Sequence, residues 1–243
     1  MNALVVESLS KNFGGLAAVL NLSFELREGE ILSLIGPNGA GKTTVFNCLT
    51  GFLQADRGDV KLGGCSLKGL RPHEICRLGM VRTFQIVRPF LNISVLDNVL
   101  VGAMLRERSL SAAKAKAMEI VEFVGLGRFC HTAASALPLP LRKRLELAKA
   151  VATGPRILLL DEVMAGLNPT EVDELIGLIR AVNSDGVSVL LIEHVMRGVM
   201  ALSQRVIAIN YGQRIAEGTP HEIVKDKGVI EAYLGREFLD SEG

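Results

Sequence analysis

The sequence predicts an α/β protein with a mostly parallel core, an N-terminal antiparallel layer and an inserted helical lobe. Three observations along the 243-residue chain predict this fold. The first third has the pattern of strands, residues 94–152 follow the helix period, and the last third alternates strands with helices. Hydrophobic residues make up 49% of the chain, which suffices for a large packed interior and excludes a disordered protein.

We expect one domain with two lobes. The core lobe is predicted to comprise about residues 1–86 and 155–235, and the helical lobe about residues 87–154. The remaining residues, 236–243, are polar and are expected to form a loose tail.

Short strands are predicted in the first third. Residues 4–7 and 20–26 alternate apolar with polar or small side chains, as half-buried strands do. Residues 30–35 form an apolar run between glycines, which is typical of a buried strand. Residues 60–62 run into a Gly-Gly pair and predict a short strand with a turn.

In the middle of the chain, Ser111 is predicted to cap a helix with Ala115, Met118, Val121 and Val124 on one face. This helix is the main element of the expected helical lobe.

The last third contains two buried-strand runs, at residues 157–160 and 187–192, each followed by a helical pattern. Asn168, Pro169 and Glu171 are the cap, first position and acidic partner expected at a helix start. A similar start signal is formed by Thr219, Pro220 and Glu222. The first of these helices is predicted to bury Val172, Leu175, Ile176 and Ile179.

Composition excludes several classes of protein. Lys and Arg total 27 against 26 Asp and Glu, so the net charge of +1 argues against nucleic-acid binding through a bulk positive field. Mean hydropathy is high, at +0.33, yet the apolar runs are strand-sized, so neither a membrane span nor a secretory leader is expected. The four cysteines show no C-x-x-C spacing, which favours free thiols in a reducing cytosol. We therefore expect a soluble intracellular chain, one that could sit against a membrane partner.

A glycine-rich loop directly after the strand at residues 30–35 matches the pattern G-x-x-x-x-G-K-S/T. Glycines let the backbone N–H groups turn toward phosphate oxygens, and the following helix directs its positive end at the same anion. Lys42 would reach the outer phosphates and the Thr43 hydroxyl would bind magnesium. The alternative is a simple strand-to-helix turn. The predicted nucleotide-binding residues here are Gly36, Pro37, Asn38, Gly39, Ala40, Gly41, Lys42, Thr43 and Thr44.

Two carboxylates, Asp161 and Glu162, end the buried run at residues 157–160. Ligands collect at the C-terminal edge of a parallel sheet, and successive strand residues point to opposite sides. We therefore expect Asp161 to hold magnesium and Glu162 to activate the attacking water, rather than both serving as solvated surface acids.

Gln85 and His194 follow predicted strands and would emerge at the same edge. Gln85 could orient water or magnesium, and His194 could donate a hydrogen bond to the terminal phosphate; either could instead be an ordinary surface residue. The predicted catalytic set is Lys42, Gln85, Glu162 and His194, and the predicted metal ligands are Thr43, Gln85 and Asp161.

These residues together resemble the nucleotide-binding subunit of an ABC transporter, from Phe13 to about Leu234. The family order is an adenine-stacking aromatic, the phosphate loop, a glutamine loop, a signature loop, the acidic pair, the D-loop and a switch histidine. The corresponding positions here are Phe13, 36–44, Gln85, 137–141, 161–162, 165–168 and His194. The resemblance implies a P-loop NTPase with a RecA-like core that uses ATP and Mg²⁺. For Phe13, the alternative is a core aromatic.

Finer stretches resemble the importers of branched-chain amino acids, a group whose members also carry amides, urea or aromatic acids. These stretches are Phe13-Gly14-Gly15-Leu16, Arg82-Thr83-Phe84-Gln85, Ala165-Gly166-Leu167-Asn168-Pro169, Ile192-Glu193-His194 and Ala232-Tyr233-Leu234-Gly235.

The signature segment departs from the family pattern L-S-G-G-Q. Pro138 has no hydroxyl, and neither Pro138 nor Pro140 has an N–H to donate, although Pro140 suits the first position of the following helix. Its anion-binding function is expected to be impaired. The run at residues 142–144 (Arg142, Lys143, Arg144) either compensates with charge or forms a solvated basic face. The combination of an intact phosphate loop with an impaired signature segment favours a heterodimer with a second ATP-binding subunit over a homodimer.

The resemblance implies a peripheral ATPase on the cytoplasmic face of the plasma membrane, driving transmembrane permease subunits, served indirectly by a solute-binding protein and binding no nucleic acid. Residues 87–91 would seat a permease's coupling helix or form a locally packed turn. Two other functions stay open: the regulatory half of an asymmetric pair, and a non-transport ABC ATPase.

Overall fold

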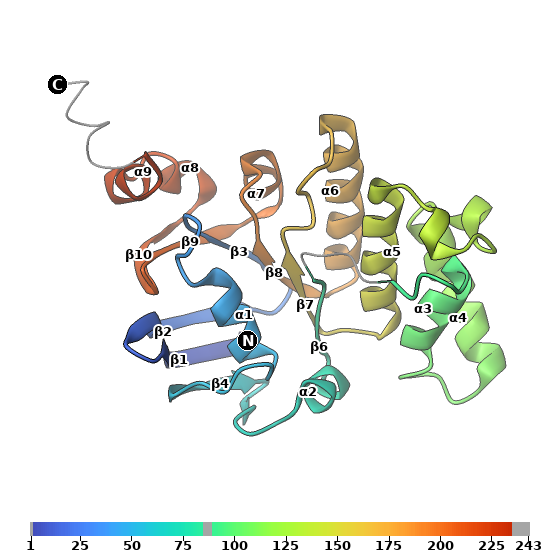
Figure 1. Cartoon of the computed structure of the whole chain (residues 1–243), viewed down its shortest axis with the longest axis horizontal. Helices are drawn as coiled ribbons and strands as arrows, with labels where there is room; N and C mark the ends of the chain where they lie inside the picture. The colour runs from blue at the N-terminus through green and yellow to red at the C-terminus, as the bar shows by residue number, and fades with distance from the viewer. Residues whose placement is uncertain (1, 85–88, 235–243) are drawn as a thin grey trace.

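The computed structural model describes residues 2–84 and 89–234, and its strands form two sheets (Figure 1). One sheet has four strands in the order β2-β1-β4-β5, and the other has six in the order β10-β9-β3-β8-β7-β6. The predicted fold class is confirmed: a mostly parallel α/β core carries an antiparallel N-terminal layer and a group of helices at one end.

The antiparallel layer consists of β1 (Asn2–Phe13), β2 (Leu16–Arg27), β4 (Arg57–Leu62) and β5 (Cys65–Ser66). Strand β1 pairs with β2 on one side and β4 on the other. Both long strands extend well beyond the short runs predicted at residues 4–7 and 20–26. Their pairing continues along the hairpin to Phe13 and Leu16, a continuation that local alternation does not reveal.

Five strands of the larger sheet are parallel, and β10 joins β9 as an antiparallel edge. Every residue of β3, β7 and β8 is buried, which explains their continuous apolar sequences. Because these three strands are parallel neighbours, their C-terminal ends meet at one edge. The strands are β3 (Ile31–Ile35), β6 (Met80–Arg82), β7 (Ile157–Asp161), β8 (Ser188–Ile192), β9 (Arg205–Asn210) and β10 (Gln213–Gly218).

Helices cover both faces of this sheet. Helix α1 (Lys42–Leu49) packs in the core between the two sheets, and α2 (Pro72–Leu78) contributes Ile75 to the same core. Helix α6 (Pro169–Ser184) packs on the opposite face, with Leu202 from α7 (Met196–Leu202). The short α8 (Pro220–Ile223) and α9 (Lys227–Leu234) pack against β3 and β9.

Two predicted helix starts are confirmed. At α6, the Asn168 side chain accepts the backbone N–H of Glu171 at 3.0 Å, and the Glu171 carboxylate accepts that of Asn168 at 2.8 Å. Thr219 and Glu222 form the corresponding capping box at α8. The face predicted for α6 is buried as expected: Val172, Leu175, Ile176 and Ile179.

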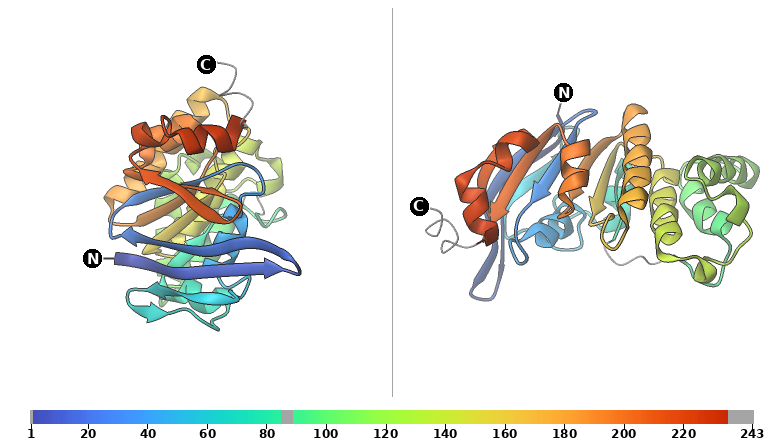
Figure 2. Two further views of the ribbon diagram at one scale, coloured as in Figure 1. Left: turned by 90° about the vertical axis from the view of Figure 1, so that its left-hand side faces the viewer. Right: turned by 90° about the horizontal axis from the view of Figure 1, so that it is seen from above.

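Helices α3 (Val95–Ala103), α4 (Leu110–Phe123) and α5 (Leu139–Ala152) lie at the end of the molecule opposite α8 and α9 (Figure 2). They share a hydrophobic cluster of their own, which includes Val99, Ala117 and Leu145. Short 3₁₀ turns at Gly127–Phe129 and Ala134–Ala136 connect α4 to α5.

The predicted start of α4 is wrong, and its predicted face is confirmed only at Val121 and Val124. Ser109, not Ser111, is the cap, and its hydroxyl accepts the N–H of Ala112 at 3.1 Å. Ala115 is exposed and Met118 only half-buried, because residues spaced by three drift around a helix with 3.6 residues per turn. The buried stripe instead follows spacings of four and three, and consists of Ala113, Ala117, Ile120, Val121 and Val124.

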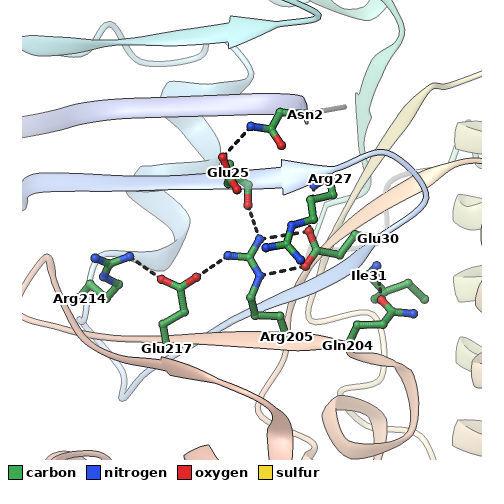
Figure 3. Close-up of polar contacts among 9 residues, drawn as sticks. All are labelled: Asn2, Glu25, Arg27, Glu30, Ile31, Gln204, Arg205, Arg214 and Glu217. Atoms are coloured by element: carbon green, nitrogen blue, oxygen red, sulfur yellow. Dashed lines mark hydrogen bonds and ion pairs between the residues drawn. The ribbon is translucent and has the colours of Figure 1, made fainter.

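An arginine at the start of β9 joins three strands of the core (Figure 3). Arg205 pairs with Glu30 through two contacts, of 2.9 and 3.1 Å, and donates to the Glu25 carbonyl at 2.6 Å. It also bonds Glu217 of β10. Burial raises the pKa of the Glu30 carboxyl, but the Arg205 hydrogen bond and charge outweigh it, so the pKa lies below its ordinary value.

Candidate functional site

The glycine-rich loop curls between the end of β3 and the start of α1. A Cβ at Gly36 would lie 2.2 Å from the Ile209 carbonyl oxygen, and one at Gly41 2.3 Å from that of Ala18. Gly41 caps α1 in the left-handed region, at φ 103°, and no side chain caps this helix. The loop therefore needs glycine at both positions, and the helix presents its N-terminus to the loop.

A hollow of about 320 Å³ lies against this loop. Of the predicted nucleotide-binding residues, Gly36 and Pro37 lie outside its lining, and the others line it: Asn38, Gly39, Ala40, Gly41, Lys42, Thr43 and Thr44. Residues 16–18, Glu162 and Tyr211 complete the wall. The exposed Tyr211 was missed by the sequence analysis, because an isolated tyrosine in a turn between strands carries no motif.

Lys42 is buried at the base of the loop, where its Nζ donates to the carbonyls of Gly36 at 2.7 Å and Pro37 at 3.0 Å. Burial lowers the pKa of this ammonium group, and the charges of Glu162 and Asp161 oppose that shift only in part. Lys42 and Glu162 line the same hollow.

The acidic pair divides between two environments, as predicted, but Glu162 lies beyond the last residue of β7, so strand alternation is not the reason. Asp161 is 2% exposed, whereas Glu162 lines the hollow. Glu162 has a left-handed backbone, at φ 48°, and its N–H donates to the Ile192 carbonyl at 2.8 Å. The switch histidine is close by, with His194 Nδ1 3.8 Å from Glu162 Oε2.

Arg82 is a site residue that the sequence analysis did not single out. Its Nη2 contacts Asp161 Oδ2 at 2.6 Å, and its Nη1 donates to Asn47 of α1 at 2.6 Å. The guanidinium lies over the rings of Phe46 and Phe84. A buried arginine requires a carboxylate partner, but the sequence alone does not say that the partner lies 79 positions away.

The structure describes the predicted adenine-stacking residue, Phe13, but not the predicted Gln85. Phe13 ends β1 and is 48% exposed, which excludes the core alternative; it does not line the hollow, and adenine stacking stays a prediction. Gln85 lies outside the described residues, as do Val87 and Arg88 of the predicted permease seat. Phe90 and Leu91 of that seat are exposed.

The signature segment forms the start of α5. Pro138 is the cap residue without a side-chain hydrogen bond, and the helix begins at Leu139, one residue before the predicted Pro140. Arg142 donates to the Ser135 carbonyl, Lys143 to the carbonyls of residues 162 and 163, and Arg144 bonds Glu174. Each cation thus has a partner within the chain. The predicted alternative of a solvated basic face is wrong for Lys143, which is buried.

The C-terminal helix α9 contacts the phosphate loop from outside the hollow. Its Val229 packs in one cluster with Ile35, the residue before the loop. Partial burial raises the pKa of the Tyr233 hydroxyl, and the backbone of Gly36 acts in the opposite direction. Helix α9 therefore packs beside the residue that precedes the phosphate loop.

Comparison with known families matches residues 19–165 to the family described as "ABC transporter". The chain belongs to the ABC transporter family. Residues 213–238, which include α9, match a second description, "Branched-chain amino acid ATP-binding cassette transporter".

Curated relatives of this ABC ATPase extend along nearly its whole length. It is 43% identical to the high-affinity branched-chain amino acid transport ATP-binding protein BraF of Pseudomonas aeruginosa, over 96% of this chain and 97% of that protein. It is 44% identical to the corresponding protein LivG of Escherichia coli, with the same two coverages. A probable LivG of Archaeoglobus fulgidus is 35% identical over 100% of this chain and 98% of its own.

Experimental structures of similar proteins share the fold. A nucleotide-free ATP-binding cassette from an ABC transporter superposes with a TM-score of 0.89 at 30% identity, covering 97% of this chain and all of that one. An ABC transporter cassette in its ADP conformation gives 0.88 at 30% identity, with the same coverages. These neighbours are nucleotide-binding cassettes, which agrees with an ATP site at the glycine-rich loop.

Proposed function

We propose that this ABC ATPase powers the import of branched-chain amino acids or related small solutes. The family match at residues 213–238 and the names of BraF and LivG support the solute class. The observation that carries the hydrolytic part is the hollow itself, which Lys42 and Glu162 both line, beside a loop whose Gly36 and Gly41 cannot be replaced without a clash.

The chain's own residues supply most of the chemistry of hydrolysis. Loop N–H groups and the N-terminus of α1 bind the phosphates, and Lys42 exchanges its two carbonyl partners for phosphate oxygens. Glu162 accepts the proton of the attacking water, and His194 hydrogen-bonds the terminal phosphate. The 3.8 Å between His194 Nδ1 and Glu162 Oε2 supports a shared role at the terminal phosphate, although only Glu162 lines the hollow.

Magnesium fits the residues present. Thr43 lines the hollow and offers a hydroxyl at the start of α1. The Asp161 carboxylate at the end of β7 is 2% exposed and pairs with Arg82, so it would hold the ion through water. Among the described residues there is no cluster of three or more His, Cys, Asp or Glu that would hold a metal alone. This agrees with Mg²⁺ held by one or two protein oxygens plus substrate phosphates, where it neutralises their charge. Gln85 stays a predicted further ligand.

Permease subunits dock, in this proposal, on an apolar face beside the core-to-helical junction. A groove of about 360 Å³ there is lined by Phe52, Phe84 and the α5 residues Glu146 and Lys149, among others. Phe52 and Phe84 meet edge-to-face with ring centroids 5.7 Å apart, and both are exposed. Phe90 adds a third exposed ring, with Lys149 5.5 Å from its centroid.

This docking would hold the chain on the cytoplasmic face of the plasma membrane. No helix in the described ranges 2–84 and 89–234 is long and apolar enough to span a bilayer. Separate permease subunits would therefore provide the pathway, and a solute-binding protein would deliver the solute. The core lobe (1–86 and 155–235) and the helical lobe (87–154) would move relative to each other during the cycle.

A second ATP-binding subunit completes the proposed assembly. Pro138 and Pro140 remove the hydroxyl and N–H donors that a signature segment would offer to the partner's nucleotide. We therefore favour a heterodimer, in which this chain's own phosphate loop serves the active site. A regulatory subunit without useful hydrolysis is the second candidate, favoured by the same two prolines.

Co-purification from membranes tests the proposal. The tagged chain should bring with it permease subunits and a second ATP-binding subunit, and the reconstituted assembly should take up leucine only with ATP. Glu162→Gln in this chain should abolish both uptake and most ATP turnover. Unchanged turnover with Glu162→Gln would leave only the regulatory function, and uptake of a different solute alone would remove the branched-chain assignment.

A further inference from the structure

Two buried side chains hold the backbone that follows β7. Lys143 Nζ, from α5, donates to the carbonyls of Glu162 at 3.2 Å and Val163 at 2.9 Å. The carboxylate of Glu193, which follows β8, accepts the N–H of Met164 at 2.7 Å. The three residues that follow β7, 162–164, are therefore hydrogen-bonded through their backbone to side chains from two other segments.

The same carboxylate also organises the switch histidine. Glu193 Oε2 accepts the backbone N–H groups of His194 at 3.3 Å and Val195 at 3.4 Å. One buried group thus contacts both the segment that carries the catalytic glutamate and the segment that carries the switch histidine. A shift of either segment would strain its hydrogen bonds to the other.

Both side chains that make these contacts are buried. Lys143 is 7% exposed and Glu193 1% exposed. Burial lowers the pKa of Lys143 and raises that of Glu193, while the charges of Glu193 and Glu162 oppose the shift of the ammonium. Such costly groups persist where they fix a conformation, and Glu162 has a left-handed backbone that only surrounding structure can maintain.

We propose that Lys143 and Glu193 are positioning residues for ATP hydrolysis, which hold Glu162 and His194 in register with each other. Lys143 is in the second turn of α5, four residues after the helix begins at the signature segment. It therefore also connects the end of α5 that would face a partner's nucleotide to the glutamate at this chain's own site. The inference rests on the proposed role of Glu162 in activating water.

Substitutions at Lys143 test this in the assembly co-purified with the tagged chain from membranes. Lys143→Met removes the donors at similar length, and Lys143→Gln restores a shorter donor. Lys116→Met is the matched control, because Lys116 in the same group of helices is exposed and pairs with the exposed Glu119. Turnover, KM for ATP, thermal midpoint and binding of a fluorescent ATP analogue are measured for each.

We expect Lys143→Met to lower kcat about 10- to 100-fold with KM and analogue binding within twofold of wild type, because a misplaced catalytic group loses rate rather than affinity. Lys143→Gln should recover part of that loss. Lys116→Met should cause no loss of kcat. Unchanged kcat in Lys143→Met overturns the proposal, as does a loss of kcat, binding and thermal midpoint together that Lys143→Gln does not relieve.

Glu193→Gln extends the test to the second positioning residue, since the amide keeps one acceptor oxygen and loses the other. It should lower kcat with KM unchanged, and an unaltered kcat contradicts the role of Glu193. Glu162→Gln in the same assay tests the proposed function apart from this inference. If the variant turns over ATP like wild type, the role of Glu162 in activating water is wrong, and this inference is wrong with it.

Discussion

Replacing Arg205 should destabilise the whole core. Arg205→Met keeps most of the side-chain length but leaves the Glu30 carboxylate, 7% exposed, without its cation. The Glu25 carbonyl and Glu217 also lose their partner. Breaking a buried pair from one side costs about 3–5 kcal/mol, and the lower end applies because Arg205 itself is 15% exposed.

The expected effect is therefore about 3 kcal/mol in the free energy of unfolding at pH 7. For a chain of this size, that corresponds to about 6–12 °C in the thermal midpoint. Urea denaturation followed by circular dichroism measures the difference. The control is Arg197→Met, because Arg197 pairs with Asp173 at the surface, where both are more than half exposed. That change should cost less than about 1 kcal/mol.

Acid provides a second test of the same contact. The pKa of Glu30 is lower in the folded protein, so its pair with Arg205 contributes its full stability above the ordinary carboxyl pKa of 4.5 and loses it as pH falls through the lower folded value. In Arg205→Met this contribution is absent, so the difference in stability between the two proteins should shrink as pH falls below 4.5. A cost under 1 kcal/mol at pH 7, or a difference that does not shrink in acid, would refute the reasoning.

Three further predictions concern the nucleotide site. Glu162→Gln should lower ATP turnover by about 10²- to 10⁴-fold, the range of a general base, with binding of the fluorescent analogue retained; loss of binding would contradict its assigned role. Gly41→Ala should weaken ATP binding at least about tenfold, because its Cβ would lie 2.3 Å from the Ala18 carbonyl oxygen. Gly177→Ala is the control, since no atom lies within 4 Å of a Cβ there, and calorimetry should show wild-type binding. Tyr233→Phe removes a partly buried hydroxyl on α9 whose pKa the Gly36 backbone lowers, and it should weaken ATP binding about 2- to 10-fold. Equal affinity in that variant would mean that α9 does not influence the loop.

Local spacing was enough to predict part of this molecule. The phosphate loop, the acidic pair and the caps at Asn168 and Thr219 each depend on residues within a few positions of one another, and the structure places each at the predicted strand or helix end. The continuous apolar runs of β7 and β8 likewise predicted buried parallel strands. At Ser111, two serines compete as caps, and only the packing of α4 decides between them.

Contacts between distant segments could not be predicted in this way. Arg82 meets Asp161 across 79 positions, and Arg205 meets Glu30 across 175. The run at residues 142–144 predicts either compensating charge at the signature segment or a solvated basic face, and nothing local indicates that Lys143 alone is buried. Such pairs depend on which strands and helices become neighbours, so they follow from the fold rather than from the motif.

The central claim is that the loop at residues 36–44 binds the phosphates of ATP while Glu162 faces the terminal phosphate. A crystal structure of the Glu162→Gln chain with ATP and Mg²⁺ tests it directly. We predict the phosphates in the hollow, with Lys42 Nζ contacting them instead of the carbonyls of Gly36 and Pro37. Nucleotide bound elsewhere, or Lys42 still paired with both carbonyls beside bound ATP, would contradict the account.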